Sequence, residues 1–291
     1  MSTPALPDLT GCTYVITGAN SGLGFETAVK LAGAGGHVVL AVRDTARGEE
    51  AARRIPGSTE VRELDLADLA SVRSFAAGFD AEITTLINNA GIMMVAQGLT
   101  ADGFERQFGT NHIGHYVLTN LLLAQVTDRV VTLSSGLHRG PQINFDDLEF
   151  TSSTYSPTRA YQRSKLANLL FTSALQRRLD GVGSSVKAMA AHPGYSATNL
   201  QSHHASGWMK RAMALGNRVI ATSAEFGSRP PVHAVVADLP GDTYVGPTKF
   251  NGLRGAPGPN DRSAAAGDVA ASERLWAISE ERTGVGFGLP G

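Results

Sequence analysis

The chain has 291 residues, of which 42% are hydrophobic and 18% are charged, a composition typical of a protein that buries a substantial core. Its 25 basic and 26 acidic residues leave a formal net charge of -1, which removes the electrostatic case for binding nucleic acid or an anionic membrane. The chain shows neither a signal-peptide pattern nor the roughly 18 to 20 apolar residues of a membrane span, and Cys12 is its single cysteine. We therefore expect a cytoplasmic protein in a reducing compartment.

Short β-branched runs alternate with longer helical patterns along the chain. The runs predict strands at residues 13–17, 37–42, 60–66, 84–89, 128–135, 186–193 and 242–246. The patterns between them predict helices near residues 22–34, 45–55, 68–79, 101–124 and 158–180. Such alternation is typical of βαβ crossovers, so we expect an α/β, Rossmann-like, doubly wound and mostly parallel sheet with helices on both faces.

The character of the sequence changes after about residue 199. Residues 201–227 predict one or two short helices, residues 252–268 a loop rich in Gly and Pro, and residues 268–284 a last helix that ends at Gly284. Strands are too scarce in this tail for a second sheet. We therefore expect a single domain over residues 1–291, in which residues 196–291 form the substrate pocket and complete the core of residues 10–195.

A glycine-rich turn follows the first predicted strand. Gly18, Gly22 and Gly24 have the spacing TGxxxGxG at the start of a predicted helix. This context is typical of a dinucleotide site, where glycines permit a tight turn and let the backbone approach a pyrophosphate at a helix N-terminus. Asn20 and Ser21 can add side-chain hydrogen bonds within the turn. The alternative is a glycine-rich loop without chemical meaning.

The end of the second predicted strand bears on the choice of dinucleotide. An NAD site has an acidic residue there, whereas this chain has Val42 followed by Arg43. An arginine can bind a 2′-phosphate through charge-assisted hydrogen bonds, and Arg47 could assist. Asp44 would repel that phosphate unless it caps the helix that follows. The sequence favours NADP(H), with NAD as the alternative.

Tyr161 and Lys165 lie four positions apart in the predicted helix of residues 158–180. This spacing places both on one helix face, with Ser164 beside them. The pair fits proton transfer, but it equally fits a packed tyrosine and a lysine whose charged end reaches solvent. The pair alone does not decide between these alternatives.

Seven motifs in order resemble the short-chain dehydrogenase/reductase family over about residues 10 to 200. They are TGANSGLG (17–24), DL (65–66), NNAG (88–91), TNHIGHYVLTNLLL (110–123), SS (134–135), YQRSK (161–165) and HPGYSAT (192–198). Within that family the chain looks like the retinol-dehydrogenase and protochlorophyllide-reductase-like members. The resemblance implies one Rossmann-like domain with a sheet of about seven strands, and an oxidoreductase that acts on a carbonyl or an alcohol.

The resemblance also implies the residues that hold the dinucleotide. Asp65 would bind the adenine beside the Leu66 backbone, NNAG would lie along the ribose, and HPGYSAT would hold the carboxamide. Together with the glycine turn, the implied set is Gly18, Asn20, Ser21, Gly22, Leu23, Gly24, Arg43, Asp65, Leu66, Asn89, Ala90, Gly91, Tyr161, Lys165, Pro193, Gly194 and Thr198.

Four residues would carry catalysis by the same resemblance. Tyr161 would be the general acid or base, and Lys165 would stabilise its phenolate, because a free tyrosine titrates only near pH 10. Ser135 would orient the substrate oxygen; we choose it over Ser134 because the family places the catalytic serine last. Asn111 would hold a water that links Lys165 to solvent.

Other readings of these residues stay open. A dinucleotide-binding sensor or scaffold without chemistry is the main alternative, whereas a serine hydrolase at Ser135 lacks a GxSxG motif. No carboxylate or cysteine accompanies the histidine pairs 112/115 and 203/204 at ligand spacing, so we expect packing or surface histidines and no metal.

The substrate pocket should be largely apolar. We expect a small apolar carbonyl or alcohol to contact residues from three segments, namely Met93, Met94, Leu137, Tyr195, Trp208, Met209 and Met213. The alternative is that these residues pack the tail or a subunit contact. The resemblance allows a homodimer or a homotetramer, unless the loop-rich C-terminus covers the usual interface.

Overall fold

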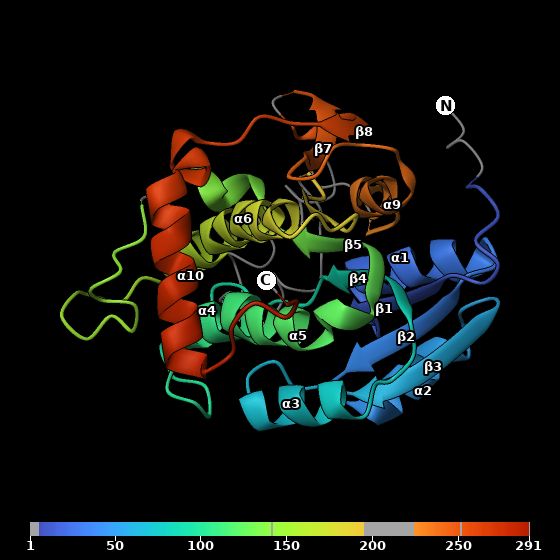
Figure 1. Ribbon diagram of the computed structural model, residues 1–291, viewed down its shortest axis with the longest axis horizontal. Helices are drawn as coiled ribbons and strands as arrows, with labels where there is room; N and C mark the ends of the chain where they lie inside the picture. Colours follow the sequence, from blue (N-terminus) through green and yellow to red (C-terminus); the bar gives the residue numbers. More distant parts are fainter. Residues whose placement is uncertain (1–5, 141, 195–223, 251, 291) are drawn as a thin grey trace, which may run out of the picture.

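The protein is built around one sheet of eight strands in the order β3-β2-β1-β4-β5-β6-β7-β8 (Figure 1). The computed structural model describes residues 6–140, 142–194, 224–250 and 252–290. Strands β1 to β7 pair in parallel and β8 pairs antiparallel with β7. The strands span Thr13–Thr17 (β1), His37–Val42 (β2), Ser58–Glu63 (β3), Ile83–Asn88 (β4), Val126–Leu133 (β5), Lys187–Ala191 (β6), Tyr244–Lys249 (β7) and Arg254–Pro259 (β8).

Helices cover both faces of the sheet, which confirms the doubly wound α/β prediction (Figure 1). One core packs the sheet against α3 (Leu69–Ala77), α5 (Gly114–Leu122), α6 (Pro157–Gly181) and α10 (Val269–Thr283). The other packs it against α1 (Gly22–Gly33), α2 (Thr45–Ala52) and α9 (Arg229–Val236). Neighbouring strand residues enter opposite cores, as Val15 and Ile16 do, because successive side chains of a strand point to opposite faces.

Strand β8 corrects the prediction of a loop over residues 252–268. Pro257 and Pro259 lie in this strand, opposite Pro247 and Val245 of β7. Proline cannot donate to a ladder of hydrogen bonds, so within sheets it is confined to edge strands such as β8, to strand starts and to irregularities such as the register shift beside Pro247. The edge position of β8 explains why the composition misled, and why the expected count of about seven strands was one short.

The predicted helix over residues 101–124 is broken into three parts. It begins at Arg106 with α4 (Arg106–Phe108), passes through a π turn over Gly109–Ile113 and continues as α5. Helix α9 was not predicted, although Pro230 and Pro231 in its first turn fit the preference of proline for a helix start. The last helix ends as predicted, with Gly284 left-handed at φ +66. Of the tail helices predicted over 201–227, the described part is α8 (Ala224–Gly227).

Strands β3, β4, β5 and β6 end earlier than predicted, and for β3 and β5 this places predicted site residues in loops. Strand β3 ends at Glu63 and β5 at Leu133, so Asp65 and Ser135 follow their strands by two residues. The carboxyl ends of parallel strands meet at one edge of the sheet, where ligands of open α/β sheets bind.

Candidate active site

A cavity of about 1650 Å³ lies at the carboxyl edge of the sheet. It extends from the turn after β1 to the loops after β6 and β8. Nearly all of the predicted site residues line it, namely Gly18, Asn20, Ser21, Gly22, Leu23, Gly24, Arg43, Asp65, Leu66, Asn89, Ala90, Gly91, Ser135, Tyr161, Lys165, Pro193 and Gly194. Asn111 is buried behind the wall, and Thr198 lies outside the described residues.

The glycine turn has the shape that a pyrophosphate requires. Gly18 and Gly22 have φ of +66 and +56, a conformation that favours glycine. A Cβ on Gly22 would meet nothing within 4 Å, whereas a Cβ on Gly24 would lie 2.5 Å from Nδ2 of Asn89. The absence of a side chain at Gly24 thus lets the start of α1 approach Asn89 at the end of β4. At Gly22 no atom of the described residues covers the backbone at the N-terminus of α1, where it lines the cavity. These residues fit a dinucleotide pyrophosphate.

Two exposed arginines lie at the rim of the cavity beside this turn. Arg43 and Arg47 both line it, and neither has an ion pair within the described part of the chain. Asp44 caps α2, its Oδ1 accepting from the Arg47 backbone N–H at 3.0 Å. The carboxylate is therefore used as a cap, and the rim offers two guanidinium groups to an anion.

The NNAG turn is tied to the end of β1. Nδ2 of Asn89 donates to the Thr17 carbonyl at 2.7 Å, and the backbone N–H groups of Asn89 and Ala90 donate to Oγ1 of Thr17 at 2.9 Å. These bonds hold the turn against the glycine turn, so both walls of the ribose region form one unit. Asp65 lines the cavity. Its carboxylate also orders the loop in which it lies, because it accepts a hydrogen bond from the Ala67 N–H at 2.9 Å.

Tyr161, Ser135 and Lys165 meet on the opposite wall. Tyr161 is 7% exposed and its hydroxyl hydrogen-bonds Ser135. Burial raises the pKa of Tyr161 to about 12, although the bond with Ser135 acts to lower it. Burial also lowers the pKa of Lys165 to about 8, and its Nζ lies 5.8 Å from the Tyr161 ring centroid. Desolvation of the phenolate is thus the largest effect on the phenol, and the role of Lys165 in stabilising the phenolate stays a prediction.

Lys165 is fixed to the end of β5 by reciprocal hydrogen bonds. Its Nζ donates to the Leu133 carbonyl at 3.1 Å, which also accepts from Nδ2 of Asn168 at 2.9 Å. Oγ of Ser134 donates back to the Lys165 carbonyl at 2.8 Å. The hydroxyl of Ser134 is therefore used inside the fold. Both serines line the cavity, but Ser135 is the one whose side chain hydrogen-bonds Tyr161.

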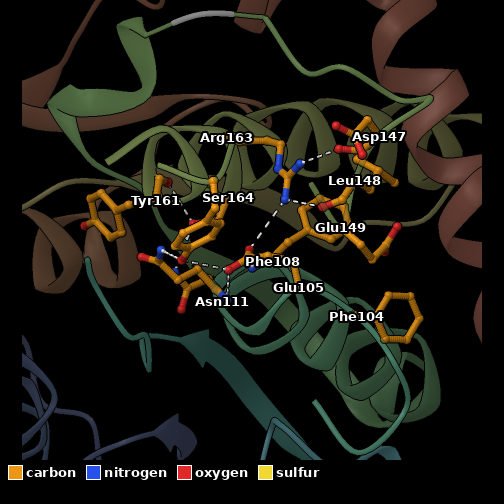
Figure 2. Close-up of polar contacts among 12 residues, drawn as sticks. Phe104, Glu105, Phe108, Asn111, Asp147, Leu148, Glu149, Tyr161, Arg163 and Ser164 are labelled. Carbon is orange, nitrogen blue, oxygen red and sulfur yellow. Dashed lines mark hydrogen bonds and ion pairs between the residues drawn. The ribbon is translucent and has the colours of Figure 1, made fainter. Parts of the chain in front are cut away.

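Asn111 lies in the π turn and its side chain is fully engaged. Oδ1 accepts from the Ile92 N–H at 2.8 Å, and Nδ2 donates to the Ile92 carbonyl and to Oγ of Ser164, each at 2.9 Å. Figure 2 shows Asn111 facing Tyr161 and Ser164, with Arg163 directed to the other side toward Asp147 and Leu148. A water at Asn111 would therefore bind its backbone carbonyl rather than its amide.

The substrate end of the cavity mixes apolar and polar groups. Met93 and Leu137 line it as predicted. Met94 is 38% exposed and does not line it, while Tyr195, Trp208, Met209 and Met213 lie outside the described residues. Three polar residues that were not predicted, Arg139, Asn260 and Asp261, also line this end.

Comparisons with known proteins agree with this geometry. The model of the short chain dehydrogenase family matches residues 13–207. The chain belongs to the short-chain dehydrogenase family. Human retinol dehydrogenase 13 is 40% identical over 97% of the chain and 87% of its own length, and human retinol dehydrogenase 12 is 40% identical over 95% and 88%. A crystal structure of an uncharacterized protein from Mycobacterium paratuberculosis has a TM-score of 0.87 at 52% identity, covering 98% of this chain and 97% of that one.

A more distant family structure carries a dinucleotide. The chain described as an NAD(P) dependent gluconate 5-dehydrogenase from Beutenbergia cavernae has bound NADP. It has a TM-score of 0.58 at 26% identity and covers 78% of this chain and 90% of that one. The protein is thus an oxidoreductase of this family, similar to retinol dehydrogenases.

Three residues of the present protein hold the candidate site together, although the sequence predictions did not name them for this role. Thr17 anchors NNAG, Asn168 shares a carbonyl with Lys165, and His115 contacts Thr17 at 2.9 Å. Thr17 stands directly before the glycine turn. Asn168 lies three positions after Lys165, on the same face of the helix. The sequence therefore contained a local signal for both residues. The partner of His115 is 98 residues away, and no local pattern could reveal it.

The described residues form neither a metal cluster nor a membrane-spanning helix. Among the residues that the structure describes, no three His, Cys, Asp or Glu side chains are grouped to hold a metal ion. His112 and His115 are both buried, which agrees with packing rather than surface histidines, and the pair at 203 and 204 lies outside the described residues. No helix in the described ranges is long and apolar enough to cross a membrane.

Proposed function

We propose that the protein is an NADP(H)-dependent oxidoreductase that interconverts an apolar carbonyl compound and the corresponding alcohol. The observation that carries this proposal is one cavity that joins the glycine turn and two free arginines to Tyr161 and Ser135. When bound, a nicotinamide dinucleotide supplies or accepts the hydride. Gly18, Gly22 and the N-terminus of α1 would hold its pyrophosphate.

Tyr161 acts as the general acid in the reductive direction. Its raised pKa keeps the phenol protonated at neutral pH, which is the form that donates a proton to the carbonyl oxygen of the substrate. Ser135 orients that oxygen through its hydroxyl. Lys165 is cationic below pH 8 and stabilises the phenolate once the proton has left. The Asn111 carbonyl can hold the water through which a proton returns from solvent.

The choice of NADP(H) over NAD(H) rests on the rim of the cavity. Arg43 and Arg47 lie there without ion-pair partners among the described residues, and Asp44 is used as a helix cap. A 2′-phosphate would pair with these guanidinium groups, whereas a bare ribose hydroxyl would leave them unused. The NADP in the structure from Beutenbergia cavernae is consistent with this choice.

The class of substrate is inferred from the lining and from the relatives. Met93, Leu137 and Leu253 line the substrate end, and the relatives are named for retinol, an apolar alcohol. An apolar substrate would pack on these side chains, while Arg139 and Asn260 face its more polar end. We also propose a cytoplasmic location and a homodimer or a homotetramer.

The test is to assay a panel of carbonyl compounds and alcohols. Turnover is measured as the change in absorbance of the dinucleotide, with NADPH and NADH in separate assays. Turnover with NADPH and a loss of about a hundredfold or more in Tyr161→Phe would support the proposal. Unchanged turnover in Tyr161→Phe, or NADPH binding without any turnover, would favour the sensor or scaffold. Arg43→Ala should lower the ratio of kcat/KM for NADPH over NADH by roughly tenfold, with Arg53→Ala as a control of equal charge outside the cavity.

A further inference from the structure

His115 lies in α5 with its ring between the two halves of the site. The residue is 1% exposed. Its Nδ1 is 3.0 Å from the backbone oxygen of Asn111, and its Nε2 is 2.9 Å from Oγ1 of Thr17. One ring nitrogen thus contacts the turn that carries Asn111, and the other contacts the end of β1 beside the glycine turn.

The protons in this contact can be assigned from the chemistry of the partners. A carbonyl oxygen only accepts, so Nδ1 of His115 carries a proton. Burial lowers the pKa of His115 to about 4, so the ring is neutral and Nε2 is an acceptor. The Thr17 hydroxyl therefore donates to Nε2 at 2.9 Å rather than to the Ile87 carbonyl at 3.5 Å. Its oxygen accepts from the N–H groups of Asn89 and Ala90.

On the Nδ1 side of His115, the hydrogen bonds lead to Asn111, which lies next to Lys165. The π turn over Gly109–Ile113 carries Asn111, whose side chain clamps both backbone groups of Ile92. A Cβ on Gly91 would lie 3.2 Å from Oδ1 of Asn111 and 3.5 Å from Nζ of Lys165. A small displacement of Asn111 would therefore change the surroundings of the lysine. π turns of this kind occur frequently at functional sites.

We propose that His115 is a positioning residue which, as the neutral Nδ1–H tautomer, couples Asn111 on the catalytic side to Thr17 and the NNAG turn on the dinucleotide side. The geometry gives each nitrogen a separate task. Nδ1–H fixes the backbone of Asn111, and Nε2 fixes the Thr17 hydroxyl so that both of its lone pairs face the NNAG amides. This inference rests on the proposed function, because it assigns a role in that reaction.

Two amide substitutions separate the two tasks. In His115→Asn the side-chain amide occupies the place of Nδ1, so it can donate to Asn111 but does not reach Thr17. In His115→Gln the amide reaches the place of Nε2, so it can accept from Thr17 but loses the bond to Asn111. Misplacement of a catalytic group by a fraction of an ångström is expected to slow turnover by roughly tenfold.

His112 provides the matched control. It lies one turn earlier and is equally buried, at 1% exposed, but it packs against the rings of Phe108, Tyr116 and Phe171. Its Nε2 contacts Oγ of Ser279 at 3.2 Å, on the side away from the cavity. His112→Gln should lower stability without a change in either kinetic constant beyond about twofold.

The full-length protein is assayed with NADPH and a substrate found in the panel above. His115→Gln should lower kcat by roughly tenfold with the KM for NADPH unchanged, and His115→Asn should raise the KM and the Kd for NADPH about fivefold with kcat nearly unchanged. ¹⁵N NMR of the wild-type imidazoles should show His115 as a neutral Nδ1–H tautomer.

Three outcomes would overturn this role. They are an Nε2–H tautomer, kinetic constants in both His115 variants that match those of His112→Gln, or equal losses of kcat in both variants in proportion to their loss of stability. Failure of the proposed function would show differently, as unchanged turnover in Tyr161→Phe, and the NMR and NADPH-binding measurements do not depend on turnover.

Discussion

Acidification should destabilise the protein well above the pH at which its carboxylates are protonated, because several histidines are buried as neutral rings. Burial lowers the pKa of His112 to about 3 and of His115 and His192 to about 4. The folded pKa values lie below the ordinary histidine value of about 6.5, so the unfolded chain binds more protons at mildly acidic pH. Stability is therefore present above about pH 6.5 and is lost as the pH falls toward 4.

The size of the effect follows from these values. At about pH 5 an unfolded histidine is almost fully protonated and a folded one with a pKa near 4 is not, which costs about 2 kcal/mol per residue. Three such residues give a loss of roughly 6 kcal/mol between about pH 7 and about pH 5, a large fraction of the stability of a typical domain. His138 and His233 act in the same direction, since burial lowers their pKa as well.

His112→Phe tests this reasoning without touching the site. The phenyl ring replaces the imidazole among the neighbouring rings and loses the single bond to Ser279. Urea unfolding followed by circular dichroism at about pH 7 and about pH 5 should show that the variant loses about 2 kcal/mol less than the wild type. Equal losses in the two proteins would refute the argument, because they would mean that His112 does not titrate on unfolding.

Three further predictions concern the buried pair of Glu105 and Arg163, Gly91 and Lys165. Glu105→Gln removes the carboxylate that lies 3.5 Å from the Arg163 guanidinium, so the buried charge of Arg163 keeps only neutral hydrogen-bond partners such as backbone carbonyls. This change should cost about 3 to 5 kcal/mol of unfolding free energy in urea titrations. Gly91→Ala places a methyl group 3.2 Å from Oδ1 of Asn111, so kcat should fall about tenfold while stability changes by less than about 1 kcal/mol. The rate of carbonyl reduction should fall as pH rises above 8, because Lys165, whose pKa burial lowers to about 8, then loses its charge; a profile from about pH 6 to about pH 10 would show this.

Controls separate these effects from general damage. Asp146→Asn removes an ion pair with Arg274 whose side chains are 82% and 54% exposed, and it should cost less than about 1 kcal/mol. Gly181→Ala adds a methyl group that meets nothing within 4 Å, and its kcat should stay at the wild-type value. A Glu105→Gln variant as stable as Asp146→Asn, or a reduction rate that is flat across pH 8, would contradict the respective prediction.

The sequence foretold the fold best where one local pattern decides the structure. The bounds of β1 and β2 were predicted to the residue, because each is a buried β-branched run followed directly by a turn or a helix cap. Helix α6 was expected over residues 158–180 and spans Pro157–Gly181, with Ser156 as its N-cap and proline in its first turn. Strand β8 was not, since its glycines and prolines are tolerated only through its position at the sheet edge, which is a property of the whole sheet.

In the candidate site, too, the features that depend on local motifs were predicted and those that depend on tertiary packing were not. Motif order identified many of the residues that line the cavity. Most of them follow a strand at the carboxyl edge of the sheet, whereas Tyr161 and Lys165 lie in helix α6. What the motifs could not give is the burial of Tyr161, which raises its pKa to about 12, because burial depends on the packing of the whole wall. They could not give the partner of His115 either, since Thr17 is reached only through tertiary packing.

The assignment of the serine shows how the structure replaces a family rule with a physical reason. Ser134 and Ser135 are adjacent at the end of β5, and successive residues there point in opposite directions. Ser134 donates a hydrogen bond to the Lys165 carbonyl. In return, Nζ of Lys165 donates to the Leu133 carbonyl. These two bonds join α6 to the end of β5. Ser134 lines the cavity as well, but its hydroxyl is used in the bond to Lys165, whereas the side chain of Ser135 hydrogen-bonds Tyr161. The bonds that fix helix α6 to the strand therefore also hold Tyr161 beside Ser135, so this pairing depends on Ser134.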